Sequence, residues 1–334
     1  MAFSGFQYGD ISPRVGVFAV AKFLSHADSQ LVLAKFASSQ SLPKNKSQTL
    51  KWRRCVPFAV STTTLTEGVT PPPQGFEYED VSVSVSQYGA WNAITDVVTD
   101  TYEDPVLSNM AELCGKQAAD TQEAIIWGVI RNGSNVIFTG SATARTGVNA
   151  VITLDDIRAA TRELKAMHCK KITKRLSASP NFGTEAVNGS YIAVSHSNME
   201  RDFREMTSFV PIERYASGGA IHENEIGKVE EVRVILTPHL EPFFGAGDTT
   251  LTGVLNNNAR VDVYPVVIFG EEAFGVASLK GMDSANISVM NPKMGASYED
   301  PLGQRGFVSW KFWFAAVRLN ENWMIKIESA CTAL

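Results

Sequence analysis

Charged residues, cysteines and long apolar runs are all scarce in this chain of 334 residues. Charged residues make up 19% of it against 44% hydrophobic residues, a balance that favours a folded core over disorder. The formal net charge of −5 lacks the basic excess that is typical of proteins that bind nucleic acid phosphates. One short basic cluster, Lys51-Trp52-Arg53-Arg54, runs against that trend. The composition therefore predicts a folded protein that does not hold DNA or RNA through its overall charge.

The spacing of the cysteines and the length of the apolar runs exclude further classes. The cysteines form no C-x-x-C pair, which argues against a zinc site or a disulfide framework and for reduced thiols in a cytosolic protein. They are Cys55, Cys114, Cys169 and Cys331. Apolar runs such as Val15–Ala21 are far shorter than the roughly 20 residues that a bilayer requires. We therefore expect no signal peptide, no transmembrane helix and no membrane partner.

Motifs that carry catalytic chemistry are also missing. The chain has no phosphate-binding G-x-x-x-x-G-K-[ST] loop, and Gly245-Ala246-Gly247 lacks the third glycine of a dinucleotide fingerprint. His222-Glu223 has no second histidine at zinc-protease spacing, and no G-x-S-x-G elbow occurs. We interpret Glu223-Asn224-Glu225 as a solvated loop tip. These absences predict no catalytic, cofactor-binding or metal-binding residue, although catalytic groups can also converge in space.

Residues 1 to about 30 mix Gly, Ser, Pro and apolar residues, which is typical of an extended arm. A short helix is expected after Pro13, and the arm is rich in aromatic side chains. They are Phe3, Phe6, Tyr8, Phe18 and Phe23. Aromatic side chains in such number would make a free arm insoluble, so we expect them to dock on this subunit or on a neighbour.

Two strand-like segments, residues 48–58 and 76–89, flank a long proline-rich connector. The second contains strict apolar–polar alternation from Val81 to Ser86, typical of a strand with one buried face. Together they predict a long hairpin with basic residues on one strand and acidic residues on the other, where facing charges stabilise the pair. Two interpretations remain open: an ordinary solvated hairpin, or an arm laid over an adjacent subunit with these charges pairing between chains.

The clearest helix signal follows, over residues 105–131. Asp104 is placed to cap it and Pro105 suits its first turn, while Asn132-Gly133 ends it. At this length it would span about 40 Å, which suggests a spine that crosses an elongated subunit. Apolar residues recur along it with near-helical spacing. They are Val106, Leu107, Met110, Leu113, Cys114, Ala118, Ile125 and Val129.

The remaining chain alternates strands and short helices, which makes the predicted fold class α+β. Strands are expected at 135–140, 190–194, 229–236, 263–269 and 275–279. Helices are expected at 153–168, with Leu154, Ile157, Ala160, Leu164 and Met167 on one face, and at 197–206. Residues 215–227 and 241–260 are predicted loops. The end is predicted to be a hairpin of residues 306–319 and 323–329.

The order of these parts resembles the tailed-bacteriophage major capsid proteins, which have the Hong Kong 97-type fold, and within them the podovirus-type family. The segments that carry the resemblance are Leu31–Ala37, Gln48–Arg54, Leu65–Pro71, Gln87–Gly89 and His222–Val229. The resemblance implies an N-terminal arm (1–45), an extended hairpin or E-loop (46–100), a peripheral domain with a spine helix (101–140 and 285–334) and an axial domain (141–284). Residues 241–260 match no part of it.

The resemblance also implies a function, which is assembly into the hexamers and pentamers of an icosahedral head. The head would enclose double-stranded DNA without sequence-specific binding, with scaffold, portal and decoration proteins as possible partners. The protein would be made in the host cytoplasm and reside in the virion. Hairpin residues expected to contact a neighbouring subunit are Lys51, Trp52, Arg53, Arg54, Glu67, Glu77, Glu79 and Asp80. The alternatives are an encapsulin-like nanocompartment shell and a soluble α+β enzyme.

Overall fold

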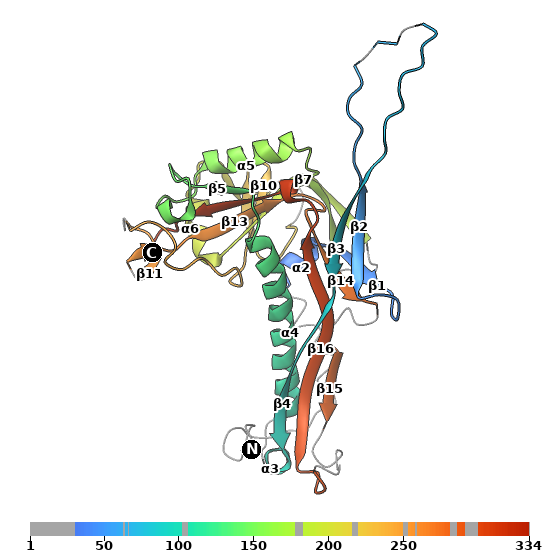
Figure 1. Cartoon of the computed structure of the whole chain (residues 1–334). Coiled ribbons are helices and arrows are strands. Elements are labelled where there is room, and N and C mark those ends of the chain that lie inside the picture. The colour runs from blue at the N-terminus through green and yellow to red at the C-terminus, as the bar shows by residue number, and fades with distance from the viewer. Residues whose placement is uncertain are drawn as a thin grey trace.

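The computed structural model describes residues 31–62, 64–65, 67–101, 106–177, 183–215, 220–249, 253–257, 259–280, 286–290 and 300–333. The aromatic arm, the helix expected after Pro13 and the expected cap at Asp104 lie outside the described residues. The described chain builds two sheets joined by one long helix, and a hairpin of β2 and β3 projects away from both sheets (Figure 1). The predicted mixture of helices and strands is therefore confirmed.

The larger sheet has eight strands and carries its own hydrophobic core. In spatial order its strands are β5 (Val136–Phe138), β17 (Met324–Ser329), β13 (Tyr264–Phe269), β7 (Gly183–Ser195), β10 (Val232–Leu236), β9 (Glu225–Val229) and β8 (Phe209–Pro211), with β6 (Ile172–Ser177) paired to β7. Every residue of β10, β13 and β17 is buried. Both faces of these central strands are therefore covered.

Helix α5 (Leu154–Ala166) covers one face of this sheet (Figure 1). Its start is specified locally, because the Thr153 hydroxyl and the Asp156 carboxylate form a capping box. Ile157, Ala160 and Leu164 are buried as predicted. Met167, which the periodicity also placed on the buried face, follows the helix and is 52% exposed. The predicted helix at 197–206 appears as a 3-10 turn, Ser197–Met199, followed by α6 (Glu200–Arg204).

The smaller sheet has five strands and packs against the long helix α4 (Val106–Arg131). Its strands are β1 (Ser38–Leu42), β14 (Phe274–Leu279), β16 (Arg305–Arg318) and β15 (Asn286–Met290) in spatial order, with β4 (Ser86–Thr95) paired to β16. Alternate residues of β16 are buried toward α4, among them Trp310, whose indole N–H donates to the Gln117 side chain over 2.9 Å. Helix α4 runs alongside β16 and β4 (Figure 1), as a spine.

Helix α4 confirms the predicted long helix, and its buried face shifts along its length. Val106, Leu107, Met110, Cys114 and Ala118 are buried as predicted. Leu113 is 65% exposed, because it lies about 100° around the helix from Cys114. Ile125 and Val129 are half-buried, and the core residues of the last two turns are Ile126, Trp127 and Ile130.

Two predicted features of the C-terminal half are wrong. The terminal hairpin does not form: β16 lies in the five-stranded sheet, whereas β17 pairs with β13 and β5 in the eight-stranded sheet. The predicted strand at 229–236 is confirmed as β10, although it begins only at Val232, because β9 ends at Val229 and the chain turns back at Glu230 with a φ of 52°. Glu225, predicted in a solvated loop tip, is 4% exposed and forms a salt bridge with buried Arg233.

The remaining short elements are local. Helix α2 (Leu33–Phe36) packs against α4, and α3 (Asp96–Thr101) follows β4 directly. Within the predicted loop 241–260, the chain forms the small pair β11 (Asn256–Asn257) and β12 (Arg260–Val261). In the described part of the chain, no helix is both long and apolar enough to cross a membrane.

Candidate functional site

The projecting hairpin is built from β2 (Thr49–Cys55) and β3 (Tyr78–Ser84). Its antiparallel register sets Trp52 opposite Val81, and so confirms the predicted hairpin. The alternating run that suggested one continuous second strand is divided: β3 ends at Ser84, and β4 begins at Ser86 and pairs with β16. Val85, at the division, is buried in a small cluster with Ala277 and Ala315. The hairpin is thereby anchored on the five-stranded sheet.

Four of the predicted contact residues pair with one another across the hairpin. Arg53 Nε and Nη2 donate to the two Asp80 oxygens over 2.8 and 3.1 Å, and Arg54 Nε donates to Glu79 over 2.8 Å. The hydrogen bond from Arg53 lowers the pKa of the Asp80 carboxyl. In the isolated subunit these charges therefore pair with one another inside one chain. Contact of the hairpin with an adjacent subunit stays a prediction.

The other four predicted residues divide into an anchor and three free charges. Trp52 is half-buried and packs against the small cluster at the base of the hairpin. Lys51, Glu67 and Glu77 are exposed, and none of them forms a salt bridge with another described residue. The structure thus brings Trp52 onto the body of the subunit and leaves these three charges in solvent.

Exposed apolar side chains are concentrated on the outer part of this hairpin, and the sequence interpretation did not single them out. They are Val56, Phe58, Val60, Leu65, Val69, Phe76 and Tyr78. Phe76 contacts Phe58 and Tyr78, at ring-centroid separations of 6.1 and 4.6 Å. An apolar group of this size on a projecting arm is typical of a surface that another protein covers. The sequence signal that could have indicated this apolar group is the pair Phe58 and Phe76, which flanks the proline-rich connector.

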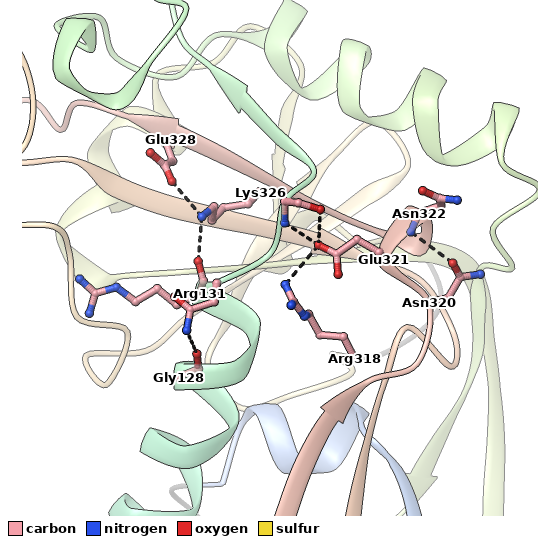
Figure 2. Close-up of polar contacts among 10 residues, drawn as sticks. Gly128, Arg131, Arg318, Asn320, Glu321, Asn322, Lys326 and Glu328 are labelled. Carbon is pink, nitrogen blue, oxygen red and sulfur yellow. Dashed lines mark hydrogen bonds and ion pairs between the residues drawn. The ribbon is translucent and has the colours of Figure 1, made fainter. Parts of the chain in front are cut away.

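A second cluster of polar contacts joins α4 to the turn between β16 and β17 (Figure 2). Lys326 Nζ donates to the Arg131 carbonyl over 2.8 Å and lies 2.9 Å from Glu328. Glu328 also receives two hydrogen bonds of 2.7 Å from Arg145. Burial alone would raise the pKa of Glu328, but its bonds to Arg145 and Lys326 outweigh burial and lower it. The last helical turn of α4 is therefore tied to β17 of the eight-stranded sheet.

Glu321 completes this junction from the turn itself (Figure 2). Its carboxylate accepts hydrogen bonds from the Ser134 backbone and hydroxyl, just after α4, and from Arg318 at the end of β16 over 3.2 Å. The carboxylate of this turn thus holds the end of β16 and the segment after α4, which is far away in the sequence. This arrangement fixes the turn through which the chain passes from β16 of the five-stranded sheet to β17 of the eight-stranded sheet.

A buried acid links the N-terminal segment to α4. Glu123 is 1% exposed, and its carboxyl oxygens accept the backbone N–H groups of Leu33 and Ala34 over 3.1 and 3.3 Å. Burial raises the pKa of Glu123 to about 7. Nothing in the sequence marked this residue, because a glutamate in a long helix usually faces water.

The described residues contain no group of three or more His, Cys, Asp and Glu side chains that could hold a metal ion. The polar clusters above instead consist of carboxylates that accept hydrogen bonds from basic side chains, a hydroxyl or backbone N–H groups. What the geometry presents is a long projecting arm with exposed apolar side chains and a body held rigid by its junctions. Both features suit contact between protein subunits.

Comparison with known proteins also indicates a protein that forms contacts between subunits. A family model described as phage capsid protein matches residues 78–327. The major capsid protein of Pseudomonas phage KPP21 is 25% identical over 273 residues, which cover 76% of this chain and 68% of that protein. The capsid of Ralstonia phage GP4 has a TM-score of 0.70 at 10% identity, over 100% of this chain and 95% of that chain. The capsid of cyanophage Pam1 has a TM-score of 0.63 at 14% identity, over 99% and 98% of the two chains, so both solved structures share the fold. The family model covers well over half of the sequence, and the chain therefore belongs to the phage capsid protein family.

Proposed function

We propose that this chain is a phage major capsid protein, which self-assembles into the hexamers and pentamers of an icosahedral head. The observation that carries the proposal is the projecting β2–β3 arm with its exposed apolar side chains, in a chain that belongs to the phage capsid family. A monomer gains nothing from such an arm, whereas in a shell a neighbouring subunit would bury it.

We further propose that the subunit has the Hong Kong 97-type organisation, with α4 as the spine of a peripheral domain and the β2–β3 hairpin as the E-loop. The packing of α4 along the five-stranded sheet supports this assignment, as does the separate core of the larger sheet. Strand pairing suggests changes to the predicted boundaries 101–140, 141–284 and 285–334, because β5 and β17 lie in the eight-stranded sheet and β14 lies in the five-stranded sheet. Because β17 lies between β5 and β13, residues from Met324 onward go with the axial domain.

The proposed cargo is double-stranded DNA, enclosed without sequence-specific binding. The formal net charge of −5 supports a container that does not grip its contents. The proposed location is the virion, after synthesis in the host cytoplasm, and portal, scaffold and decoration proteins are the proposed further partners. An encapsulin-like nanocompartment is not favoured, because the matching family and the curated relative are both described as phage proteins.

Electron microscopy and sedimentation of the purified recombinant protein test the proposal directly. We expect closed shells or capsomer rings that sediment far ahead of a 36.4 kDa monomer. A protein that stays monomeric under all assembly conditions would contradict it. For the cargo, particles from infected cells should protect double-stranded DNA from nuclease. Particles that protect an enzyme and no DNA would favour the nanocompartment.

A further inference from the structure

A cavity of about 420 Å³ lies near one edge of the eight-stranded sheet, far along the sheet order from β17. Its wall comes from the turn between β9 and β10, from the segment after β8 and from residues 188–190 of β7. We call it the sheet-edge cavity. It shares no residue with the projecting arm or with the junction at Glu321.

The two acidic residues of the cavity wall form salt bridges with basic residues that lie outside the cavity. Glu230 lies 2.6 Å from Arg158 of helix α5. Glu231 lies 2.8 Å from Lys165 and 2.9 Å from Lys171. These carboxylates therefore contribute little net negative charge to the cavity.

The cations of the cavity are not all neutralised. Arg233 is buried and pairs with Glu225 over 3.2 Å. Arg214 and Lys228 line the same cavity, and neither forms a salt bridge with a carboxylate of the described residues. The wall consequently presents two positive charges that the described chain leaves without an anion.

The cavity wall also contains the hydroxyl-bearing residues Tyr215 and Ser190. The Tyr215 hydroxyl donates to Glu225 over 2.8 Å, and Lys228 Nζ lies 5.4 Å from the centroid of the Tyr215 ring. The Ser190 side chain lines the cavity at 6% exposure, and its oxygen has no hydrogen-bond partner among the described residues. Because a buried hydroxyl is stabilised by a hydrogen-bond partner, this group can bind a polar ligand that enters the cavity.

We propose that the sheet-edge cavity binds a carboxylate side chain from a second copy of this chain. Two unpaired cations and an unpaired hydroxyl match the acceptor oxygens of an anion. The chain carries 35 acidic residues against 30 basic ones. In an assembled shell, a neighbouring copy therefore brings carboxylates close to the cavity. A contact between the cavity of one copy and an acidic side chain of the next is head-to-tail, and head-to-tail contacts between identical subunits can form closed rings. The inference rests on the proposed function, since it needs copies side by side.

A density map of assembled shells tests the contact directly. We expect a carboxylate of the adjoining chain within 4 Å of the Arg214 or Lys228 side-chain nitrogens, the distance that defines a salt bridge. A cavity that holds only water or a free anion in well-ordered shells would overturn the inference and leave the proposed function intact. Failure of the wild-type protein to form any shell would instead reject the proposed function.

Inorganic phosphate serves as a probe of the same cavity in unassembled subunits. Arg214→Gln with Lys228→Gln should weaken phosphate binding at least tenfold in a calorimetric titration and reduce shell yield. The matched control, Arg162→Gln with Lys170→Gln, removes two exposed cations outside the cavity and should leave both unchanged. Equal binding by wild type and the cavity variant, or full shell yield from that variant, would overturn the inference. So would phosphate binding by intact shells as tightly as by subunits, since the cavity should then be filled.

Discussion

At the scale of single residues, Glu123 shows how a buried charge couples stability to pH. Its carboxyl accepts the first backbone N–H groups of α2, so it joins the N-terminal segment to the spine helix. Burial raises its pKa from 4.5 to about 7, and the folded chain therefore binds a proton more tightly than the unfolded chain. The contribution of Glu123 to stability is full below pH 4.5, and about 3 kcal/mol is lost as the pH rises to 7.

Glu123→Gln tests this coupling, because the amide stays neutral and still offers an acceptor oxygen. We expect the wild-type free energy of unfolding to fall between pH 4.5 and 7 by an amount that the variant lacks, measured by urea unfolding at several pH values. Glu163→Gln, which changes an exposed glutamate of α5, is the control and should keep the wild-type slope. Identical slopes in wild type and Glu123→Gln would show that Glu123 does not titrate in this range.

At the scale of elements, the β2–β3 arm and helix α4 have different tasks. The arm is charge-neutral at its Arg–Asp and Arg–Glu pairs, and solvent-exposed pairs of this kind contribute little to stability. Its exposed rings therefore offer more to a partner than its paired charges do. Helix α4 is buried along one face and carries the packing of the five-stranded sheet.

Phe58→Ser with Phe76→Ser should reduce shell yield by an order of magnitude or more and leave the subunit folded. Both side chains are more than half exposed, so their loss removes contact area for a partner and little from the core. Yield is measured by sedimentation, and folding by thermal unfolding of the unassembled subunit. Met167→Ser, at an exposed site away from the arm, is the control. Wild-type yield from the double variant would remove the arm from the assembly contacts.

Ala118→Pro should destabilise the subunit by about 3 kcal/mol or more, because proline removes a backbone donor and clashes with the preceding turn. Ala118 lies in the middle of α4 and is buried. Ala118→Gly, expected to cost about 1 kcal/mol, separates the loss of helix geometry from a simple change of side chain. Urea unfolding or the soluble fraction on expression provides the measurement. A proline variant as stable as the glycine variant would contradict the continuous helix.

At the scale of the whole molecule, β17 unites the two halves of the subunit. The chain leaves the five-stranded sheet at Arg318, turns at Glu321 and enters the eight-stranded sheet between β5 and β13 (Figure 2). All six residues of β17 are buried, including Lys326 and Glu328, which form a salt bridge with each other. A strand in this position is part of the core and no terminal appendage.

Truncation after Trp323 should abolish soluble protein, because it removes the strand between β5 and β13. Had β16 and β17 formed the predicted hairpin, the truncation would remove only a strand at one edge of a sheet. Removal of Ala333 and Leu334 alone is the control, since it spares β17 and the bonds from Thr332 to Asp202. The soluble fraction and circular dichroism decide between the two arrangements. A folded protein from the longer truncation would mean that β17 is dispensable.

The sequence by itself determined the elements whose signals are local. The periodicity of α4, the cap of α5 and the facing strands of the hairpin depend on residues a few positions apart or on one continuous pattern. The fold class and the family resemblance followed from the order of these parts. Such features persist in the folded chain because neighbouring residues specify them before any distant contact forms.

Only the tertiary structure decided which distant segments meet. The pattern of β17 alternates, with Lys326 and Glu328 at its polar positions, and so resembles the half-exposed strand of a terminal hairpin. Those two side chains are nevertheless buried, because Arg131 and Arg145 approach from other segments and satisfy them. Glu123 is buried for the same reason, beside the backbone N–H groups of Leu33 and Ala34, which are far away in the sequence. Glu225 is buried beside Arg233, which lies on the adjacent strand β10. Burial of a charge depends on its partner, and only folding brings that partner close.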